Sequence, residues 1–143
     1  MVIDTHILRE SLTEAPEDSI VGLVASRKIA ALISDKIRYE YDRILQRERE
    51  GSMEAKLRLY SALRAMHGIP DVVPTRRVQD LVIDRSDWPF VAATLQYGAV
   101  LITSDWPHIL SVEKELAEVG VEVMKPYDFA VRVGIVQPVV AGR

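Results

Sequence analysis

The chain has 143 residues, of which 48% are hydrophobic, and a formal net charge of −3. This length fits one domain with one core, and no apolar run approaches the length of a membrane span. The absence of cysteine excludes disulfides and thiolate sites, and with three histidines any metal site must rest mainly on oxygen ligands, which suits Mg²⁺ or Mn²⁺.

The first residues form an apolar run that meets Asp4 after only three positions. A signal peptide has a longer apolar region and a basic start. We therefore expect a cytoplasmic protein that does not enter the membrane.

Short apolar runs and amphipathic segments alternate along the chain. In chain order, we expect strand 2–4, helices 7–12 and 18–26, strand 29–34, helices 35–50 and 53–66, strand 81–83, helix 88–97, strand 99–103, helix 107–119, strand 121–124 and helix 126–133. Residues 68–77 contain two prolines and are expected to form a loop. This alternation predicts an α/β fold with a parallel sheet covered by helices on both sides. We expect residues 1–133 to form the domain and residues 134–143 a tail.

The sequence Ser-Asp-Trp-Pro occurs twice, at 86–89 and 104–107, each time after a strand-like run. The two copies contain both tryptophans and deliver Asp87 and Asp105 to predicted strand-to-helix junctions. Asp4 follows the first strand in the same way. Because such junctions gather at one edge of a parallel sheet, where ligands bind, the three carboxylates indicate a divalent cation there.

Helix capping is the simpler explanation for Asp87 and Asp105 when each is taken singly. Asp4 has no such explanation, and the joint arrival of three acids favours a site. The tryptophans have two interpretations as well. They can stack on bases at a cleft or pack against the sheet; packing is favoured for Trp88, and neither is favoured for Trp106.

Glu40 is the fourth candidate acid. Ser34 is available as the N-cap of helix 35–50, and Glu40 lies near the apolar stripe of that helix. The stripe consists of Ile37, Tyr41, Ile44 and Leu45. A glutamate beside a buried stripe needs a partner, which is either an arginine or a shared metal.

The four acids would repel one another unless a cation or protons neutralised them. Mg²⁺ commonly neutralises such a group of acids. A metal bound there can activate a water and stabilise a phosphodiester transition state.

Residues 27–85 carry 13 Lys or Arg against 9 Asp or Glu, whereas both flanking segments are acidic. Solvated helices with internal ion pairs explain most of these charges. A basic flank that holds a phosphate backbone is the alternative.

Four segments in register resemble the PIN-domain ribonucleases, and among them the toxin components of toxin–antitoxin pairs. These segments are 2–5, 33–45, 84–93 and 101–105. Order and spacing agree over about residues 1–130.

The resemblance implies a three-layer α/β/α sandwich and Mg²⁺- or Mn²⁺-dependent cleavage of single-stranded RNA. It makes Asp4, Asp87 and Asp105 the metal ligands, and these three together with Glu40, which completes or orients the site, the catalytic residues. Neighbouring polar residues are expected to support these ligands: Thr5, Asp84, Thr103 and Ser104. An antitoxin protein is the implied partner, and the resemblance together with the apolar tail and helix faces favours a homodimer.

The chain departs from the family pattern at three positions. His6 stands where the family usually has Asn, and His108 lies where a further acid is common. Asp84 is an extra acid near Asp87. These departures keep open a catalytically inactive PIN-like module that binds RNA or protein. A metal-dependent phosphatase is disfavoured because no second Asp closely follows Asp4.

Overall fold

The computed structural model describes residues 1–12, 20–47 and 51–134, so the predicted tail lies almost wholly outside the described residues. Strands β1 (Val2–Ile3), β4 (Val100–Ile102) and β5 (Glu122–Met124) pair in parallel in the order β1-β4-β5. Strands β2 (Leu32–Ile33) and β3 (His67–Gly68) form a second parallel pair.

Two hydrogen bonds join these pairs into one layer. The Met1 amino group donates to the Ala30 carbonyl at 3.0 Å, and the Leu32 N–H donates to the Met1 carbonyl at 2.9 Å. This is the bonding pattern of parallel neighbours. The strand order is therefore β3-β2-β1-β4-β5, and the carboxyl ends of all five strands lie at one edge.

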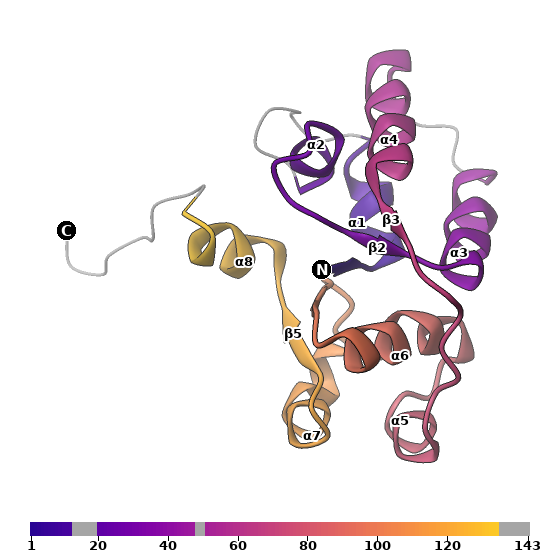
Figure 1. Ribbon diagram of the computed structural model, residues 1–143, viewed down its shortest axis with the longest axis vertical. Helices are drawn as coiled ribbons and strands as arrows, with labels where there is room; N and C mark the ends of the chain where they lie inside the picture. The colour runs from indigo at the N-terminus through magenta and orange to yellow at the C-terminus, as the bar shows by residue number, and fades with distance from the viewer. Residues whose placement is uncertain (13–19, 48–50, 135–143) are drawn as a thin grey trace.

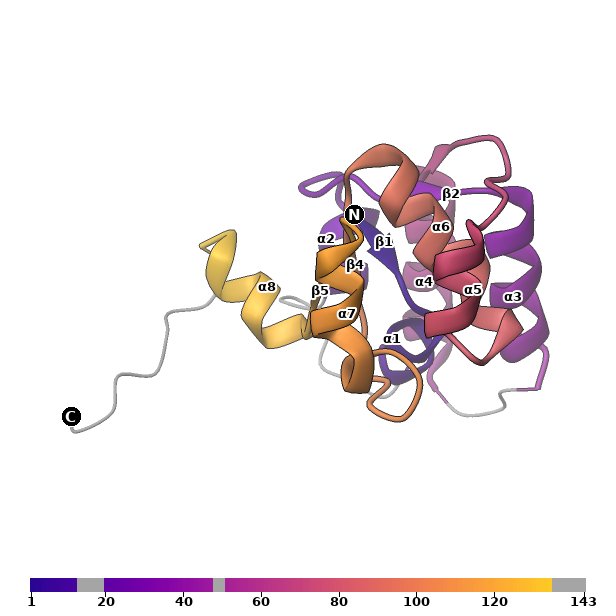
Figure 2. The same ribbon diagram turned by 90° about the horizontal axis from the view of Figure 1, so that it is seen from below.

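Helices cover both sides of this layer, as Figures 1 and 2 show. On one side lie α1 (Thr5–Glu10), α2 (Ile20–Ala25) and α4 (Met53–Ala65); on the other lie α5 (Arg76–Leu81), α6 (Trp88–Tyr97) and α7 (Glu113–Glu118). Helix α3 (Asp35–Leu45) packs on α1 and reaches α6, and α8 (Pro126–Arg132) follows β5. The fold is the expected three-layer α/β/α sandwich around a parallel sheet.

Local sequence explains several helix boundaries. The Ser34 hydroxyl accepts a hydrogen bond from the Ile37 N–H at 3.2 Å, which confirms its predicted role as the N-cap of α3. Helix α6 ends at Gly98, whose φ of 59° is the left-handed conformation that glycine adopts without a steric penalty. This turn leads the chain directly into β4.

The predicted strand 81–83 is wrong. The Thr75 hydroxyl caps a helix by accepting from the Val78 N–H at 3.3 Å, and Leu81 is the last residue of that helix, α5. An extended connection and a short 3-10 helix, η1 (Arg85–Asp87), follow it. The first copy of Ser-Asp-Trp-Pro therefore does not follow a strand.

The edge strand beside β2 is β3, which forms where helix 53–66 was expected to give way to the loop 68–77. The His67 N–H donates to the Ala31 carbonyl and the Ile69 N–H to the Ile33 carbonyl, both at 2.8 Å. The structure also has no continuous helix over 107–119. That range holds a 3-10 helix, η2 (Leu110–Val112), followed by the short helix α7.

A buried tyrosine fastens α3 to the sheet. Tyr41 is fully buried, and its hydroxyl donates to the Ile3 carbonyl at 2.6 Å. Its ring centroid lies 5.6 Å from that of Phe90 on α6. Within the described residues, no helix combines the length and the apolar character that crossing a membrane requires.

Tyr41→Phe removes this hydroxyl and leaves the Ile3 carbonyl without that partner. We expect the free energy of unfolding to fall by about 1–2 kcal/mol, the cost of an unmade buried hydrogen bond. Urea denaturation followed by circular dichroism measures the change. Tyr39→Phe is the matched control because Tyr39 is 65% exposed, and equal losses in the two variants would contradict the assignment.

Candidate metal centre

A cleft of about 540 Å³ opens where β1 and β4 end. Six of its lining residues are acidic, and Arg43 is the single Lys or Arg among the described residues that line it. The lining consists of Asp4, Thr5, His6, Glu10, Glu40, Arg43, Ile44, Asp84, Ser86, Asp87, Ser104, Asp105, Trp106, Pro107 and His108. All four predicted catalytic acids therefore face one space, and its charge is strongly negative.

Asp4 follows β1 and is 3% exposed. One carboxylate oxygen, Oδ1, accepts the Thr5 N–H at 2.8 Å, so Asp4 is the N-cap of helix α1 and the expectation that capping does not apply to it is wrong. The other, Oδ2, accepts the Thr103 hydroxyl at 2.7 Å and lies 3.2 Å from Nδ1 of His6. The carboxylate is thus held in a fixed position with its charge directed at the cleft.

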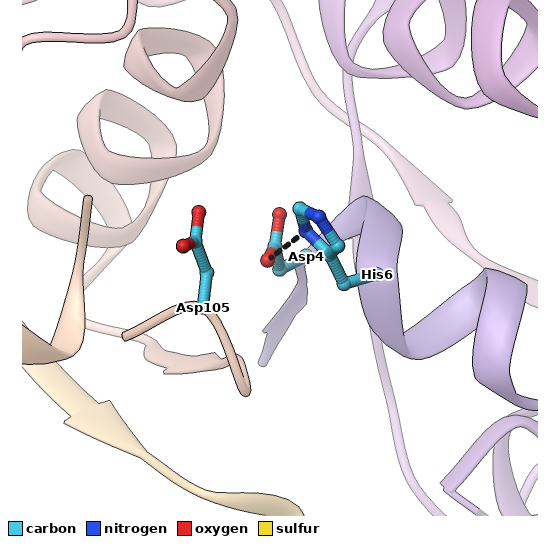
Figure 3. Close-up of side chains that lie close together, drawn as sticks. All are labelled: Asp4, His6 and Asp105. Carbon is cyan, nitrogen blue, oxygen red and sulfur yellow. Dashed lines mark hydrogen bonds and ion pairs between the residues drawn. The ribbon is translucent and has the colours of Figure 1, made fainter. Parts of the chain in front are cut away.

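Thr103 connects two of the predicted ligands. Its hydroxyl donates to Asp4 and accepts the Asp105 N–H at 3.0 Å, so the chain after β4 is fixed relative to β1. Figure 3 shows the carboxylates of Asp4 and Asp105 facing the same space, with His6 beside Asp4. Asp4, His6 and Asp105 each offer one ligand atom within 4.8 Å of the others, a spacing that could hold a metal ion.

A second group of the same kind lies in the cleft. Asp84, Asp87 and His108 also offer ligand atoms within 4.8 Å of one another. The Asp84 Oδ1 accepts the N–H of Ser86 at 3.0 Å and its hydroxyl at 2.7 Å, and these bonds lower the pKa of Asp84. The structure therefore places Asp87 with Asp84 and His108 rather than in the three-residue group of Asp4.

Asp87 is a buried carboxylate of the cleft whose charged form is destabilised by its surroundings. It is 7% exposed, precedes α6 without capping it, and its Oδ2 is buried without a hydrogen-bond partner. Burial, followed by repulsion from Asp4, Asp84 and Asp105, raises its pKa to about 7. The simple capping interpretation is therefore wrong for Asp87.

The two unexpected histidines each contact a predicted ligand. The hydrogen bond to Asp4 raises the pKa of His6, so its charged form is favoured beside the acids. The Nδ1 of His108 lies 3.3 Å from the Asp105 Oδ2. Sequence reasoning singled out both positions only as departures from a family pattern, because nothing in their spacing showed which carboxylates they would meet.

Of the two partners that its position suggested, Glu40 has the arginine. It forms an ion pair with Arg43 at 3.0 Å, and it lines the cleft with its side chain 14% exposed. It belongs to neither of the two three-residue groups found among the described residues. Its predicted catalytic role is therefore compatible with a place beside the ligands rather than among them.

The supporting residues differ in what they contact. Thr5 and Thr103 bond to Asp4, whereas the Ser104 hydroxyl donates to Glu10 at 2.9 Å. Glu10 lies in α1, and its place in the cleft was not predicted because α1 offered no periodic pattern long enough to orient it.

The two tryptophans of the repeated motif have different environments. Trp88 packs against the core and donates its indole N–H to the Val82 carbonyl at 2.7 Å, which confirms the packing interpretation. The guanidinium of Arg85 lies 5.6 Å from its ring centroid. Trp106 is 63% exposed and lines the cleft. It is therefore available to a ligand, whereas Trp88 is not.

Comparison with known proteins gives a structural relation without a sequence relation. No family model matches the chain, and no curated protein matches it. One solved structure that it resembles is VapBC2 from Rickettsia felis bound to a DNA fragment from their promoter. The alignment has a TM-score of 0.56 and 12% identity, and it covers 87% of this chain and 96% of that one. The two chains share an α/β fold.

The raised pKa of Asp87 predicts a pH-dependent stability in EDTA. Because the folded protein holds this proton more tightly than the unfolded chain, the contribution of Asp87 to stability is fully present below about pH 4 and is lost as the pH rises through about 7. Asp87→Asn removes the charge, so at about pH 8 we expect the variant to exceed the wild type by on the order of 2 kcal/mol. Urea denaturation between about pH 4 and 8 measures the difference.

Asp84→Asn is the matched control. The pKa of Asp84 is lowered by its hydrogen bonds from Ser86, so the variant loses stabilisation of its charged form and relieves only one part of the repulsion on Asp87; its gain at high pH should be smaller than that of Asp87→Asn. Parallel pH profiles for the wild type and Asp87→Asn would show that the Asp87 carboxylate is not under strain.

Proposed function

We propose that this chain is a divalent-metal-dependent endoribonuclease that cleaves single-stranded RNA in the acidic cleft. One observation carries the proposal: three buried carboxylates, Asp4, Asp87 and Asp105, come from separate segments to one cleft at the carboxyl edge of a parallel sheet. The motif resemblance to PIN-domain ribonucleases supports this reaction, and the structural similarity supports the corresponding fold.

The residues of the cleft fit Mg²⁺ or Mn²⁺. Both ions prefer carboxylate oxygens. The unpartnered Oδ2 of Asp87 is the kind of buried polar atom that a cation would satisfy. Asp4, Asp87 and Asp105 would hold the ion. When bound, such an ion stabilises charge on the phosphate and lowers the pKa of a bound water.

The chain's own side chains would position the RNA. Arg43 offers a guanidinium at the cleft for a phosphate oxygen, and its ion pair with Glu40 orients it. Trp106 offers an exposed ring on which an unpaired base can stack. Stacking of this kind needs a splayed base, which favours single-stranded over double-stranded RNA.

Mn²⁺-dependent cleavage is the primary test. End-labelled single-stranded RNA should yield products with 5′-phosphate and 3′-hydroxyl ends, because water rather than the 2′-hydroxyl is the nucleophile. We expect Asp4→Asn to lower the rate about 100-fold or more. Asp80→Asn is the control, since Asp80 is exposed on α5 and does not line the cleft.

Two results would contradict the nuclease proposal. Cleavage that survives EDTA would exclude the metal, and 2′,3′-cyclic phosphate ends would exclude water as the nucleophile. Binding of RNA without any cleavage in Mn²⁺ would favour the inactive PIN-like module instead.

We also propose an antitoxin protein as partner and a toxin role in the cell. The sequence resemblance supports this, and so does the similarity to a chain from the VapBC2 complex. A neighbouring gene that encodes a small protein with a DNA-binding signature should supply the partner, and its addition should suppress RNA cleavage.

Self-association remains a prediction, and α4 gives it a testable surface. Met53, Leu57 and Tyr60 lie on one face of this helix at exposures of 72%, 59% and 56%. The apolar tail that also motivated the prediction lies outside the described residues. We expect a dimer by analytical ultracentrifugation and a monomer for Leu57→Glu; a wild-type mass of one chain at micromolar concentration would refute the dimer.

A further inference from the structure

Two histidine-containing groups of potential ligands divide the acidic cleft. Asp4, His6 and Asp105 form one, and Asp84, Asp87 and His108 form the other. The proposed nuclease requires a cation held by Asp4, Asp87 and Asp105, and it assigns no metal role to Asp84 or His108. The question is what the second group can bind.

We infer that Asp84, Asp87 and His108 form a second divalent-cation site, and that its imidazole makes the site prefer Mn²⁺ or Co²⁺ to Mg²⁺. The inference rests on the proposed function only in taking the cleft to bind a cation. It does not require that RNA be cleaved.

The buried Asp87 carboxylate is the first argument. Asp87 is 7% exposed and lines the cleft, and one of its carboxylate oxygens is buried without a hydrogen-bond partner. Buried carboxylate oxygens normally have a partner. A cation between Asp84, Asp87 and His108 would supply one and would offset the repulsion between the two carboxylates.

The orientation of His108 is the second argument. Its Nδ1 lies 3.3 Å from the Asp105 Oδ2. A metal-bound histidine commonly donates its other ring N–H to a carboxylate, which fixes the tautomer. With Nδ1–H donated to Asp105, the neutral ring presents Nε2 as a ligand. Asp84 is likewise fixed, since its Oδ1 accepts two bonds from Ser86.

The ligand types give the selectivity. Mg²⁺ strongly favours oxygen ligands, whereas imidazole suits transition metals, whose affinities rise from Mn²⁺ to Co²⁺. A site of two carboxylates and one imidazole should therefore discriminate against Mg²⁺. Asp87 has two carboxylate oxygens, so it can serve this site and the neighbouring one together.

Calorimetric titration of the full chain with Mn²⁺, without RNA, tests the site. The wild type should bind two ions per chain, and His108→Ala should bind one with the second weakened about tenfold or more. His67→Ala is the matched control, because His67 is exposed in β3 and does not line the cleft. It should still bind two ions.

A second variant separates a ligand role from an effect on Asp105. Asp84 takes no part in the contact between His108 and Asp105, yet Asp84→Asn should lose the same equivalent of Mn²⁺. His108→Asp replaces the imidazole by a carboxylate, so its Co²⁺ affinity should fall and its Mg²⁺ affinity should rise.

One ion per wild-type chain, or two ions bound by His108→Ala with wild-type affinity, would overturn the inference. So would an unchanged ratio of Co²⁺ to Mg²⁺ affinity in His108→Asp. The cleavage assay is independent of these titrations. Two bound ions without cleavage would refute the nuclease and keep the site, whereas cleavage with one bound ion would do the reverse.

Discussion

Repulsion between buried carboxylates is the constraint around which this cleft is built. Asp4, Asp87 and Asp105 are each less than 9% exposed, and they share one edge of the sheet. Charges so placed cost stability unless hydrogen bonds, protons or cations offset them. The three carboxylates differ in how much their surroundings stabilise them. Asp4 receives three polar contacts and Asp105 a histidine, whereas one oxygen of Asp87 receives nothing. A cation would therefore stabilise the cleft most if it bound at Asp87.

The scaffold holds these charges in place through contacts made just beneath them. The Tyr41 hydroxyl binds the Ile3 carbonyl, one residue before Asp4, and Tyr41 itself follows Glu40 in α3. One hydrogen bond thus fixes two catalytic candidates relative to each other. Thr103 does the same for Asp4 and Asp105. Because β1 and β4 have only two and three residues, these side-chain bonds contribute much of the precision that longer strands would otherwise supply.

Patterns within one element were predictable from sequence, and relations between elements were less so. The Ser34 cap, the buried face of α3 and the alternation of strands and helices follow from local chemistry. Strand β3 could not be found, since His67 and Gly68 carry no strand signal. The segment is held by the N–H groups of His67 and Ile69, which donate to the Ala31 and Ile33 carbonyls. Residues 81–83 are apolar, as in a buried strand, but Leu81 is the last residue of the helix that Thr75 caps. The approach of His6 and His108 to carboxylates likewise depends on how the loops fold.

The unequal burial of the two tryptophans has an experimental consequence. Trp88 is anchored by its indole N–H, while Trp106 stands exposed at the cleft beside Asp105. Their fluorescence should therefore divide into a shielded component and a solvent-relaxed component. A paramagnetic ion in the cleft would quench the second in preference to the first. The emission of Trp88 can therefore serve as an internal reference. The emission of Trp106 would report on an ion or ligand that binds in the cleft.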